Sequence, residues 1–224
     1  MPAFGLGGCV GNLSILDPAG PAARSTALLW WVMLAGAGAS FALVMAILAL
    51  AFLRPGLGAG IPANRWLVWG GLTFPGATLA ALLIFALATG ERLLPHPGSG
   101  AYVVEAVPER WAWTFRYPGR RETRDLLHLP AGRPVDVRVI GTDVIHSFWV
   151  PRLGGKIDAI PGHVNTIRLH ADRPGRFGGV CAEFCGPGHT GMRFTAIAHE
   201  TDAFEQALAA VAPSNLTPSW DNAR

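Results

Sequence analysis

Two cysteines, a histidine and a methionine lie within one short, Gly-rich stretch of the chain. Cys181 and Cys185 are four residues apart, His189 and Met192 follow them, and a second histidine, His146, lies upstream in VIHSFWVP. Thiolates, imidazoles and a thioether are soft or borderline donors, which favour copper over hard cations. These residues therefore predict a copper site.

Other uses of cysteine and histidine fit this pattern less well. A mononuclear blue-copper site takes two His, one Cys and a weak axial Met, which leaves one cysteine over. A structural zinc site usually has C-x2-C spacing and no use for methionine, and a thioredoxin-like pair is C-x-x-C beside a βαβ pattern. A disulfide between Cys181 and Cys185 remains an alternative for the metal-free protein in an oxidising compartment. Two cysteines on one loop can instead bridge two metal ions, with a histidine at each end, as an electron-transfer centre.

The segments around these residues predict a β-rich domain. Beyond Pro95, seven pieces of seven to nine residues alternate β-branched and aromatic residues with polar ones, and Pro and Gly separate them. The pieces are AYVVEAV, WAWTFRYP, PVDVRVIG, VIHSFWVP, HVNTIRLHA, RFGGVCAEF and RFTAIAHE. Regular short strands with turn signals are typical of an antiparallel sandwich or barrel. Only Asp202–Val211 reads as a helix, and the end of the chain is expected to be loose.

Two uncharged apolar runs precede this domain, Ser25–Leu53 and Trp66–Gly90. Each exceeds the roughly 20 residues that a helix needs to cross a bilayer core of about 30 Å, and neither shows a polar face. Pro75, inside the second run, is tolerated in a membrane helix. The runs predict a two-helix transmembrane hairpin.

The short connector between the runs carries Arg54 and Arg65 and no acidic residue. The positive-inside rule places this connector in the cytoplasm, so both termini and the β-domain are expected on the outer side. The expected divisions are an N-terminal segment 1–24, the hairpin 25–94, the β-domain 95–212 and a tail 213–224. Leu6-Gly7-Gly8-Cys9 is similar to the end of a lipoprotein signal, so Cys9 is either lipidated or an ordinary terminal cysteine; both readings stay open.

Composition agrees with a membrane-anchored protein. Half of the 224 residues are apolar and only 15% are charged. The net charge of +3 is small and scattered, whereas nucleic-acid binding needs Lys and Arg clustered on one face. We therefore expect a membrane and protein partners, and no nucleic acid.

Three motifs together resemble cytochrome c oxidase subunit II. They are His146-Ser-Phe-x-x-Pro, then Lys156-x-Asp158-x-x-Pro161-Gly162-x-x-Asn165, and finally Cys181-x-Glu183-x-Cys185-Gly-x-x-His189-x-x-Met192. The hairpin, the WAWTFRYP strand and the metal motif occur in the order of that family. The resemblance implies a two-helix transmembrane hairpin followed by an all-β cupredoxin-like Greek-key sandwich or barrel.

The resemblance also implies roles for individual residues. The thiolates of Cys181 and Cys185 would bridge the two copper ions of a CuA centre, and His146 and His189 would cap them. The weak ligands would be Met192 and the carbonyl oxygen of Glu183, whose side chain would bind a magnesium ion shared with subunit I. Without the resemblance, a lone carboxylate such as Glu183 is usually solvated or ion-paired.

Trp111 would receive electrons from a c-type cytochrome, although two Trp at i and i+2 of a strand would otherwise indicate one packed face. Oxygen reduction and proton pumping would belong to partner subunits I and III in a bacterial cell membrane, because this chain has no C-x-x-C-H haem motif.

Two departures from the family are visible. The start of the second apolar run, 64–69, contains no acidic residue for a proton pathway. From residue 101 onward 14 basic and 13 acidic residues nearly balance, so electrostatic steering of a basic donor should be weak. Three other readings remain: the copper subunit of a nitric oxide reductase, a copper-free structural subunit of a quinol oxidase, and a copper delivery protein. Retention of all the predicted copper ligands argues against the quinol oxidase subunit, and the Trp strand and two-span anchor argue against the delivery protein.

Overall fold

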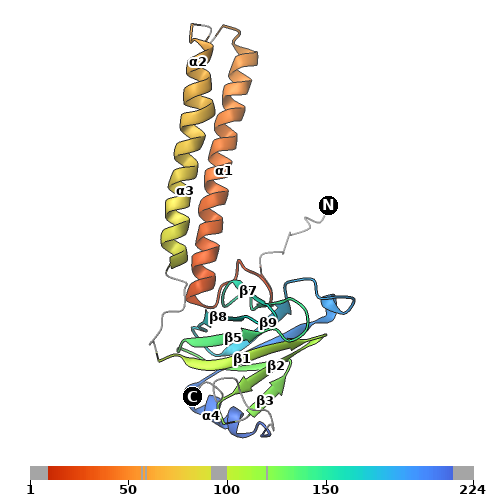
Figure 1. The fold of residues 1–224 in the computed structure, drawn as a ribbon. Helices are drawn as coiled ribbons and strands as arrows, with labels where there is room; N and C mark the ends of the chain where they lie inside the picture. Colours follow the sequence, from red (N-terminus) through yellow and green to blue (C-terminus); the bar gives the residue numbers. More distant parts are fainter. Residues whose placement is uncertain (1–9, 57, 59, 92–99, 120, 214–224) are drawn as a thin grey trace, which may run out of the picture. The chain divides into compact units, whose positions relative to one another are not determined.

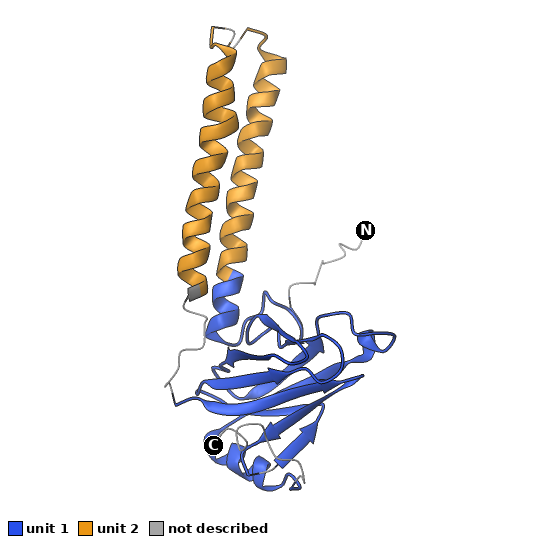
Figure 2. Ribbon diagram, viewed as in Figure 1, with its two compact units in different colours: residues 1–27, 93–224 blue, residues 28–92 orange. Residues whose placement is uncertain are grey.

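The structure, a computed structural model, describes residues 10–56, 58, 60–91, 100–119 and 121–213 (Figure 1). The chain forms two compact units, residues 28–92 and residues 1–27 with 93–224 (Figure 2). Cys9 and nearly all of the expected tail lie outside the described residues. The expected boundary at 94/95 also falls outside them, and the proposed division into four segments stays a prediction.

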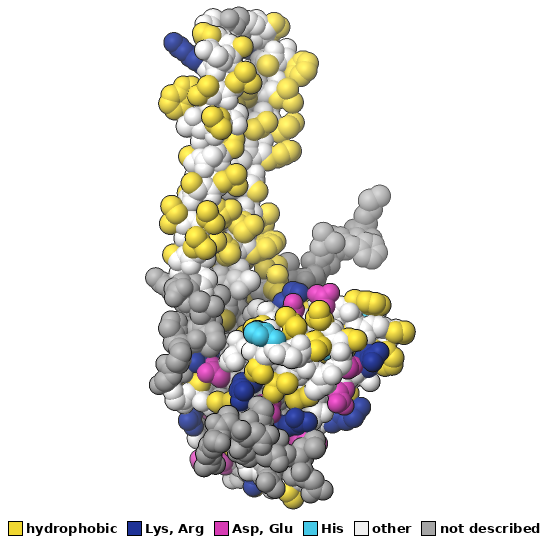
Figure 3. Space-filling view, viewed as in Figure 1, with side chains coloured by type: hydrophobic (Ala, Val, Ile, Leu, Met, Phe, Trp, Pro, Cys, Tyr) yellow, Lys and Arg dark blue, Asp and Glu magenta, His cyan; other side chains and the backbone are white. Residues whose placement is uncertain are grey.

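The first unit is a pair of apolar helices. Helix α1 spans Pro21–Leu53; after it come α2 (Ala63–Arg65), the π-helix η1 (Trp66–Thr73) and α3 (Phe74–Glu91). Pro21–Leu53 and Ala63–Gly90 are both long and apolar enough to cross a membrane, and their apolar segments are not buried within the protein. Figure 3 shows hydrophobic side chains along the hairpin, with charge on this face only near its turn. Such helices need an apolar solvent, which a bilayer supplies.

The helix type changes next to Pro75. The π-helix η1 ends at Thr73, and α3 begins at Phe74, directly before the proline. Proline has no backbone N–H, and a π-turn is one way in which a helix absorbs a missing hydrogen bond.

The second unit is a sandwich of two five-stranded sheets. Their strand orders are β3-β2-β1-β5-β8 and β4-β10-β9-β6-β7. The strands of the first sheet are β1 (Tyr102–Glu109), β2 (Ala112–Tyr117), β3 (Arg121–Arg124), β5 (Val135–Ile140) and β8 (Val164–Leu169). Those of the second are β4 (Leu126–Pro130), β6 (His146–Trp149), β7 (Lys156–Ala159), β9 (Gly175–Cys181) and β10 (Arg193–His199). The expected all-β sandwich after a two-helix hairpin is confirmed.

Two details of the expected sandwich are wrong. The sheets are not fully antiparallel, because β1 pairs in parallel with β5 and β4 pairs in parallel with β10. Parallel neighbours need a crossover, and here the chain passes through the opposite sheet between β1 and β5. The seven expected pieces also omit β3, β4 and β7, which are only four or five residues long.

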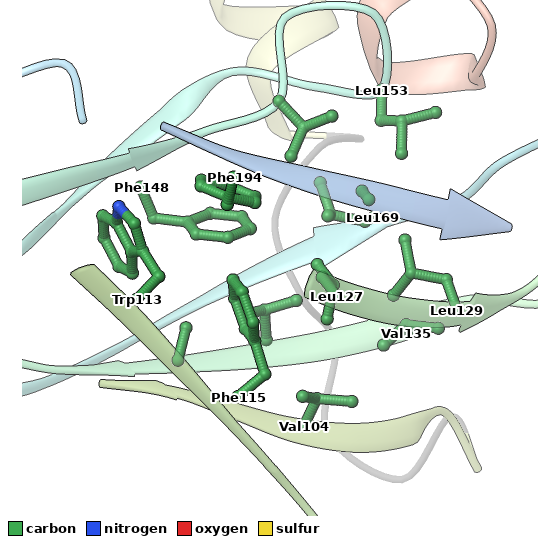
Figure 4. Close-up of a cluster of buried hydrophobic side chains, with 14 of the residues drawn as sticks. Val104, Trp113, Phe115, Leu127, Leu129, Val135, Phe148, Leu153, Leu169 and Phe194 are labelled. Carbon is green, nitrogen blue, oxygen red and sulfur yellow. The ribbon is translucent and has the colours of Figure 1, made fainter. Parts of the chain in front are cut away.

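Aromatic rings fill the space between the sheets near one end. Trp113 and Phe115 of β2 face Phe148 of β6 and Phe194 of β10, with ring centroids 5.1–6.4 Å apart (Figure 4). Gly179 of β9 is required here, because a Cβ would lie 2.2 Å from the Phe194 ring. Close packing of this kind holds strands β6 and β9 in fixed positions.

The segment before α1 is hydrogen-bonded to the sandwich. The side-chain oxygen of Asn12 accepts a hydrogen bond from the Gly178 N–H at 2.9 Å. Ala19 donates to the carbonyl oxygen of Arg152 at 2.7 Å and accepts from the N–H of Asp172 at 3.0 Å. Residues 12–19 therefore belong structurally to the β-domain.

Helix α4 (Thr201–Ala209) packs beside a pair of histidines on neighbouring strands. The rings of His128 (β4) and His199 (β10) stack at 5.1 Å, and His128 Nδ1 lies 2.8 Å from His199 Nε2. His199 also contacts Phe204 of α4. Burial lowers the pKa of both histidines, and the nearby His199 lowers that of His128 further.

This pair is expected to make stability depend on pH. An unfolded histidine has a pKa of about 6.5, so below that pH the unfolded chain binds more protons than the folded one. The free energy of unfolding should therefore fall as the pH falls through 6.5 towards the lowered folded values. Melting temperatures of the wild-type chain and of His199→Asn, measured from about pH 8 to pH 5, test this. Equal pH dependence of the two proteins would contradict it.

Candidate metal centre

The six predicted site residues on the metal motifs come together at one end of the sandwich. His146 begins β6, Cys181 ends β9, and Met192 directly precedes β10. Cys185 lies in the β9–β10 connection, followed by His189 in the short 3-10 helix η2 (His189–Gly191). Strand pairing sets Phe148 opposite Cys181, which brings the start of β6 to the end of β9. The Cys181 N–H donates to the carbonyl oxygen of Met192 at 3.0 Å and closes the loop.

The donor atoms converge on the two thiols. The Sγ atoms of Cys181 and Cys185 are 3.8 Å apart. His146 Nδ1 lies 3.8 Å from Cys181 Sγ, and His189 Nδ1 lies 3.7 Å from Cys185 Sγ. Met192 Sδ is 3.7 Å from Cys185 Sγ, and the carbonyl oxygen of Glu183 is 3.2 Å from Cys181 Sγ. Each thiol thus has one imidazole and one weaker donor beside it.

The centre is shielded from water. His146 is fully buried, Met192 is 1% exposed, and the two cysteines are 6% and 4% exposed. Burial, together with the neighbouring Cys181 and the Asp143 carboxylate, raises the pKa of the Cys185 thiol to about 11. Two adjacent thiolates are therefore unfavourable without a compensating cation, which a bound metal ion provides.

Asp143 is hydrogen-bonded to His146, one of the predicted ligands. Its Oδ1 lies 2.9 Å from His146 Nε2, so a proton on Nε2 leaves the Nδ1 lone pair directed to the thiols. Burial opposes ionisation of Asp143, but hydrogen bonds from the Val144 backbone, the His146 ring and the Arg110 backbone lower its pKa to about 2. The sequence reasoning missed Asp143. Its position three residues before His146 was the available signal.

Trp111 and Trp113 have different environments, so the reading of the two as one packed face is wrong. Trp113 is fully buried against the aromatic layer and touches His146 with ring centroids 6.3 Å apart. Trp111 precedes β2 and is 42% exposed. Its indole N–H donates to the carbonyl oxygen of Cys185 at 3.2 Å. A Cβ at Gly188 would lie 2.4 Å from the Trp111 ring, so this glycine lets the ring lie on the loop.

The side chain of Glu183 and its carbonyl oxygen have different neighbours. The carboxylate is about half exposed, and its Oε2 lies 3.8 Å from Lys156 Nζ, which is also 3.9 Å from Asp158. A magnesium ion at Glu183 would have to compete with this ammonium group. The carboxylates of Glu183 and Asp158, which both lie near Lys156 Nζ, could supply oxygen donors to such an ion.

Similarity to known proteins agrees with this site. A protein-family model described as "Cytochrome C oxidase subunit II, periplasmic domain" matches residues 121–198. Cytochrome c oxidase subunit 2 of Alkalihalophilus pseudofirmus is 35% identical over 218 residues, which cover 89% of this chain and 63% of that protein. The chain is thus similar to cytochrome c oxidase subunit II over most of its length.

Relatives within the subunit II family differ in their electron donors. Quinol oxidase subunit 2 of Bacillus cereus is 27% identical over 224 residues, 90% of this chain and 74% of that protein. The crystal structure of the subunit II periplasmic domain of Bradyrhizobium japonicum cytochrome oxidase is 29% identical, with a TM-score of 0.47. The match covers 52% of this chain and 95% of the Bradyrhizobium chain. The chain covers 63% of the length of the Alkalihalophilus relative and 35% of the length of the Synechocystis relative. Similarity alone therefore does not identify the electron donor, which has to be argued from the site.

Proposed function

We propose that this chain is the electron-accepting subunit of a cytochrome c-type terminal oxidase. It takes electrons from a c-type cytochrome at a binuclear CuA centre and passes them to the haem of subunit I, where oxygen is reduced with proton pumping. The observation that carries the proposal is the convergence of two thiols, two imidazole nitrogens and a thioether within 3.8 Å of one thiol or the other.

The residues present fit two copper ions. Cys181 and Cys185 would bridge the metals, His146 and His189 would cap them, and Met192 and the Glu183 carbonyl oxygen would be weak ligands. Thiolate, imidazole and thioether are the donor types that copper prefers. When bound, the copper pair supplies reversible one-electron transfer with its charge shared over both metals. The protein contributes a loop with buried cysteines, which strands β9 and β10 flank and an aromatic core supports, so its donors move little during the reaction.

Trp111 is the proposed point of electron arrival. Its ring is exposed on one side and hydrogen-bonded to the backbone of a proposed bridging cysteine on the other. An electron that reaches the indole from a docked cytochrome therefore has a short bonded route, N–H to carbonyl, to Cys185. Among the residues that the structure describes, Trp111 is the one exposed aromatic side chain that is hydrogen-bonded to the Cys181–Met192 segment.

The hairpin would anchor the subunit and bind subunit I, and subunit III would be a further partner. We place both termini and the copper domain on the outer side of a bacterial cell membrane, because Arg54 and Arg65 flank the turn of the hairpin. A magnesium ion at the Glu183 side chain, shared with subunit I, belongs to the same proposal and would replace the contact with Lys156.

Two alternative functions are compatible with many of the same observations. A quinol oxidase subunit 2 is among the proteins similar to this chain. A copper-free structural role, however, would not need the five clustered metal donors. A nitric oxide reductase would use the same copper centre, so it differs only in the reaction of the partner subunit.

Metal analysis of the full chain in detergent, reconstituted with copper, tests the proposal. We expect about two copper ions per chain, because the donors are enough for a bridged pair. The electron paramagnetic resonance spectrum should show the seven-line hyperfine pattern of one electron shared by two equivalent copper nuclei. A single copper with a four-line spectrum, or no copper uptake, would overturn the proposal and favour the structural-subunit alternative.

A further inference from the structure

An ion pair joins the turn that carries Trp111 to the proposed copper ligand His146. The Arg110 N–H and Nε donate to Asp143 Oδ2 at 3.1 and 3.0 Å. The other carboxylate oxygen, Oδ1, lies 2.9 Å from His146 Nε2. A second hydrogen bond lies close to this ion pair, because the Thr142 hydroxyl donates to the Pro108 carbonyl oxygen at 3.0 Å.

We propose that Arg110 and Asp143 are positioning residues that set the reduction potential of the metal centre through His146. Resting on the proposed function, this inference adds a control of the potential by two residues outside the ligand set. Asp143 holds His146 with Nδ1 towards the thiols and places a negative charge one hydrogen bond from the ligand. Arg110 offsets that charge from the outer side.

Burial gives the two members of the pair different roles. His146 is fully buried and the Asp143 side chain is 20% exposed, so the carboxylate acts on the ligand with little screening by water. The Arg110 side chain is 51% exposed and lies in the same turn as Trp111. The balancing positive charge is therefore at the surface where a donor would contact Trp111, and the carboxylate is on the metal side.

The two charges have opposite effects on the potential. Reduction adds an electron to the centre, so a nearby negative charge opposes reduction and a nearby positive charge favours it. Removing the charge of Asp143 should raise the potential. Removing the charge of Arg110 leaves the charge of Asp143 uncompensated and should lower the potential. A role limited to holding the loop in shape would not produce shifts of opposite sign.

The test uses Asp143→Asn, Arg110→Gln and the double variant in the full copper-loaded chain. Redox titration followed by the copper absorption bands should show a rise for D143N and a fall for R110Q. Each shift should be about tenfold in the equilibrium constant with a redox mediator, which is about 59 mV for a one-electron couple. The double variant, which removes both charges, should return close to the wild-type value.

Asp136→Asn is the matched control. Asp136 Oδ1 accepts from Arg168 Nε at 2.7 Å in a second ion pair, between β5 and β8, which contacts none of the metal donors described here. This variant should leave the potential unchanged. Shifts of equal sign in D143N and R110Q, or shifts as large in D136N, would overturn the inference.

Copper content separates this inference from the proposed function. Two coppers per chain with the mixed-valence spectrum in all four variants, but no opposed shifts, would reject the role of Arg110 and Asp143 alone. Failure of the wild-type chain to bind the copper pair would instead reject the proposed function.

Discussion

Substitution of Cys185 by serine is expected to abolish the two-copper centre while the β-domain stays folded. Cys185 Sγ lies within 3.8 Å of three other proposed donors, Cys181 Sγ, His189 Nδ1 and Met192 Sδ. Serine offers a hard hydroxyl oxygen that does not bridge copper ions. Loss of an outer-shell partner already lowers metal affinity by about 10–100-fold, so loss of this ligand should exceed that range.

The measurements are copper content and the paramagnetic spectrum of the full chain, with circular dichroism to confirm the fold. Serine is nearly isosteric with cysteine, so the buried position should accept it with a stability loss of about 1 kcal/mol. Cys9→Ser is the control, since it also removes one of the three cysteines and leaves the proposed bridging pair intact. A C185S chain that keeps two coppers and the seven-line spectrum would exclude Cys185 as a bridge.

Sequence reasoning located the donors of this centre because copper chemistry restricts both their types and their order. Cys181, Cys185, His189 and Met192 lie on one loop, so their spacing alone limits where they can meet. His146 is distant in sequence, so its donor type indicated the copper site but its spacing did not show where it lies relative to the loop. The pairing of β6 with β9 explains why it belongs there.

Features that depend on tertiary contacts were not predictable in this way. The ion pair of Arg110 with Asp143 joins two residues that are 33 positions apart, and nothing in either local sequence indicates the contact. The stacking of His128 on His199 follows from the parallel pairing of β4 with β10, which a local pattern cannot reveal. Short strands such as β7 have too few residues to show a period of two.

The two tryptophans show how backbone position overrides spacing. On a regular strand, residues at i and i+2 share one face. Trp111 instead lies in the turn before β2, where it contacts the Cys185 loop, and only Trp113 enters the core. The Trp111 ring is 42% exposed, and exposed tryptophans are enriched among the residues that dominate protein interfaces, which favours a contact with a partner.

Substitution of Trp111 by leucine is expected to slow electron arrival without loss of copper. Leucine removes the exposed ring that a donor would contact and the N–H donated to the Cys185 carbonyl oxygen. Truncation of a central aromatic at a protein interface costs about 2 kcal/mol or more, which is about thirtyfold in the second-order rate. The rate is measured by stopped flow, as reduction of the copper centre by a reduced soluble c-type cytochrome.

Trp149→Leu provides the matched comparison, because the Trp149 indole N–H also donates to a backbone carbonyl oxygen, that of Gly154, at 3.1 Å. This second variant loses an equivalent ring and hydrogen bond but contacts a different loop, so its rate should stay close to that of the wild type. Reduction by a small-molecule reductant should be similar in all three proteins, since it does not require docking at Trp111. If W111L keeps the wild-type rate with the cytochrome, electrons reach the centre by another surface. If it is slow with both reductants, the substitution has damaged the centre itself.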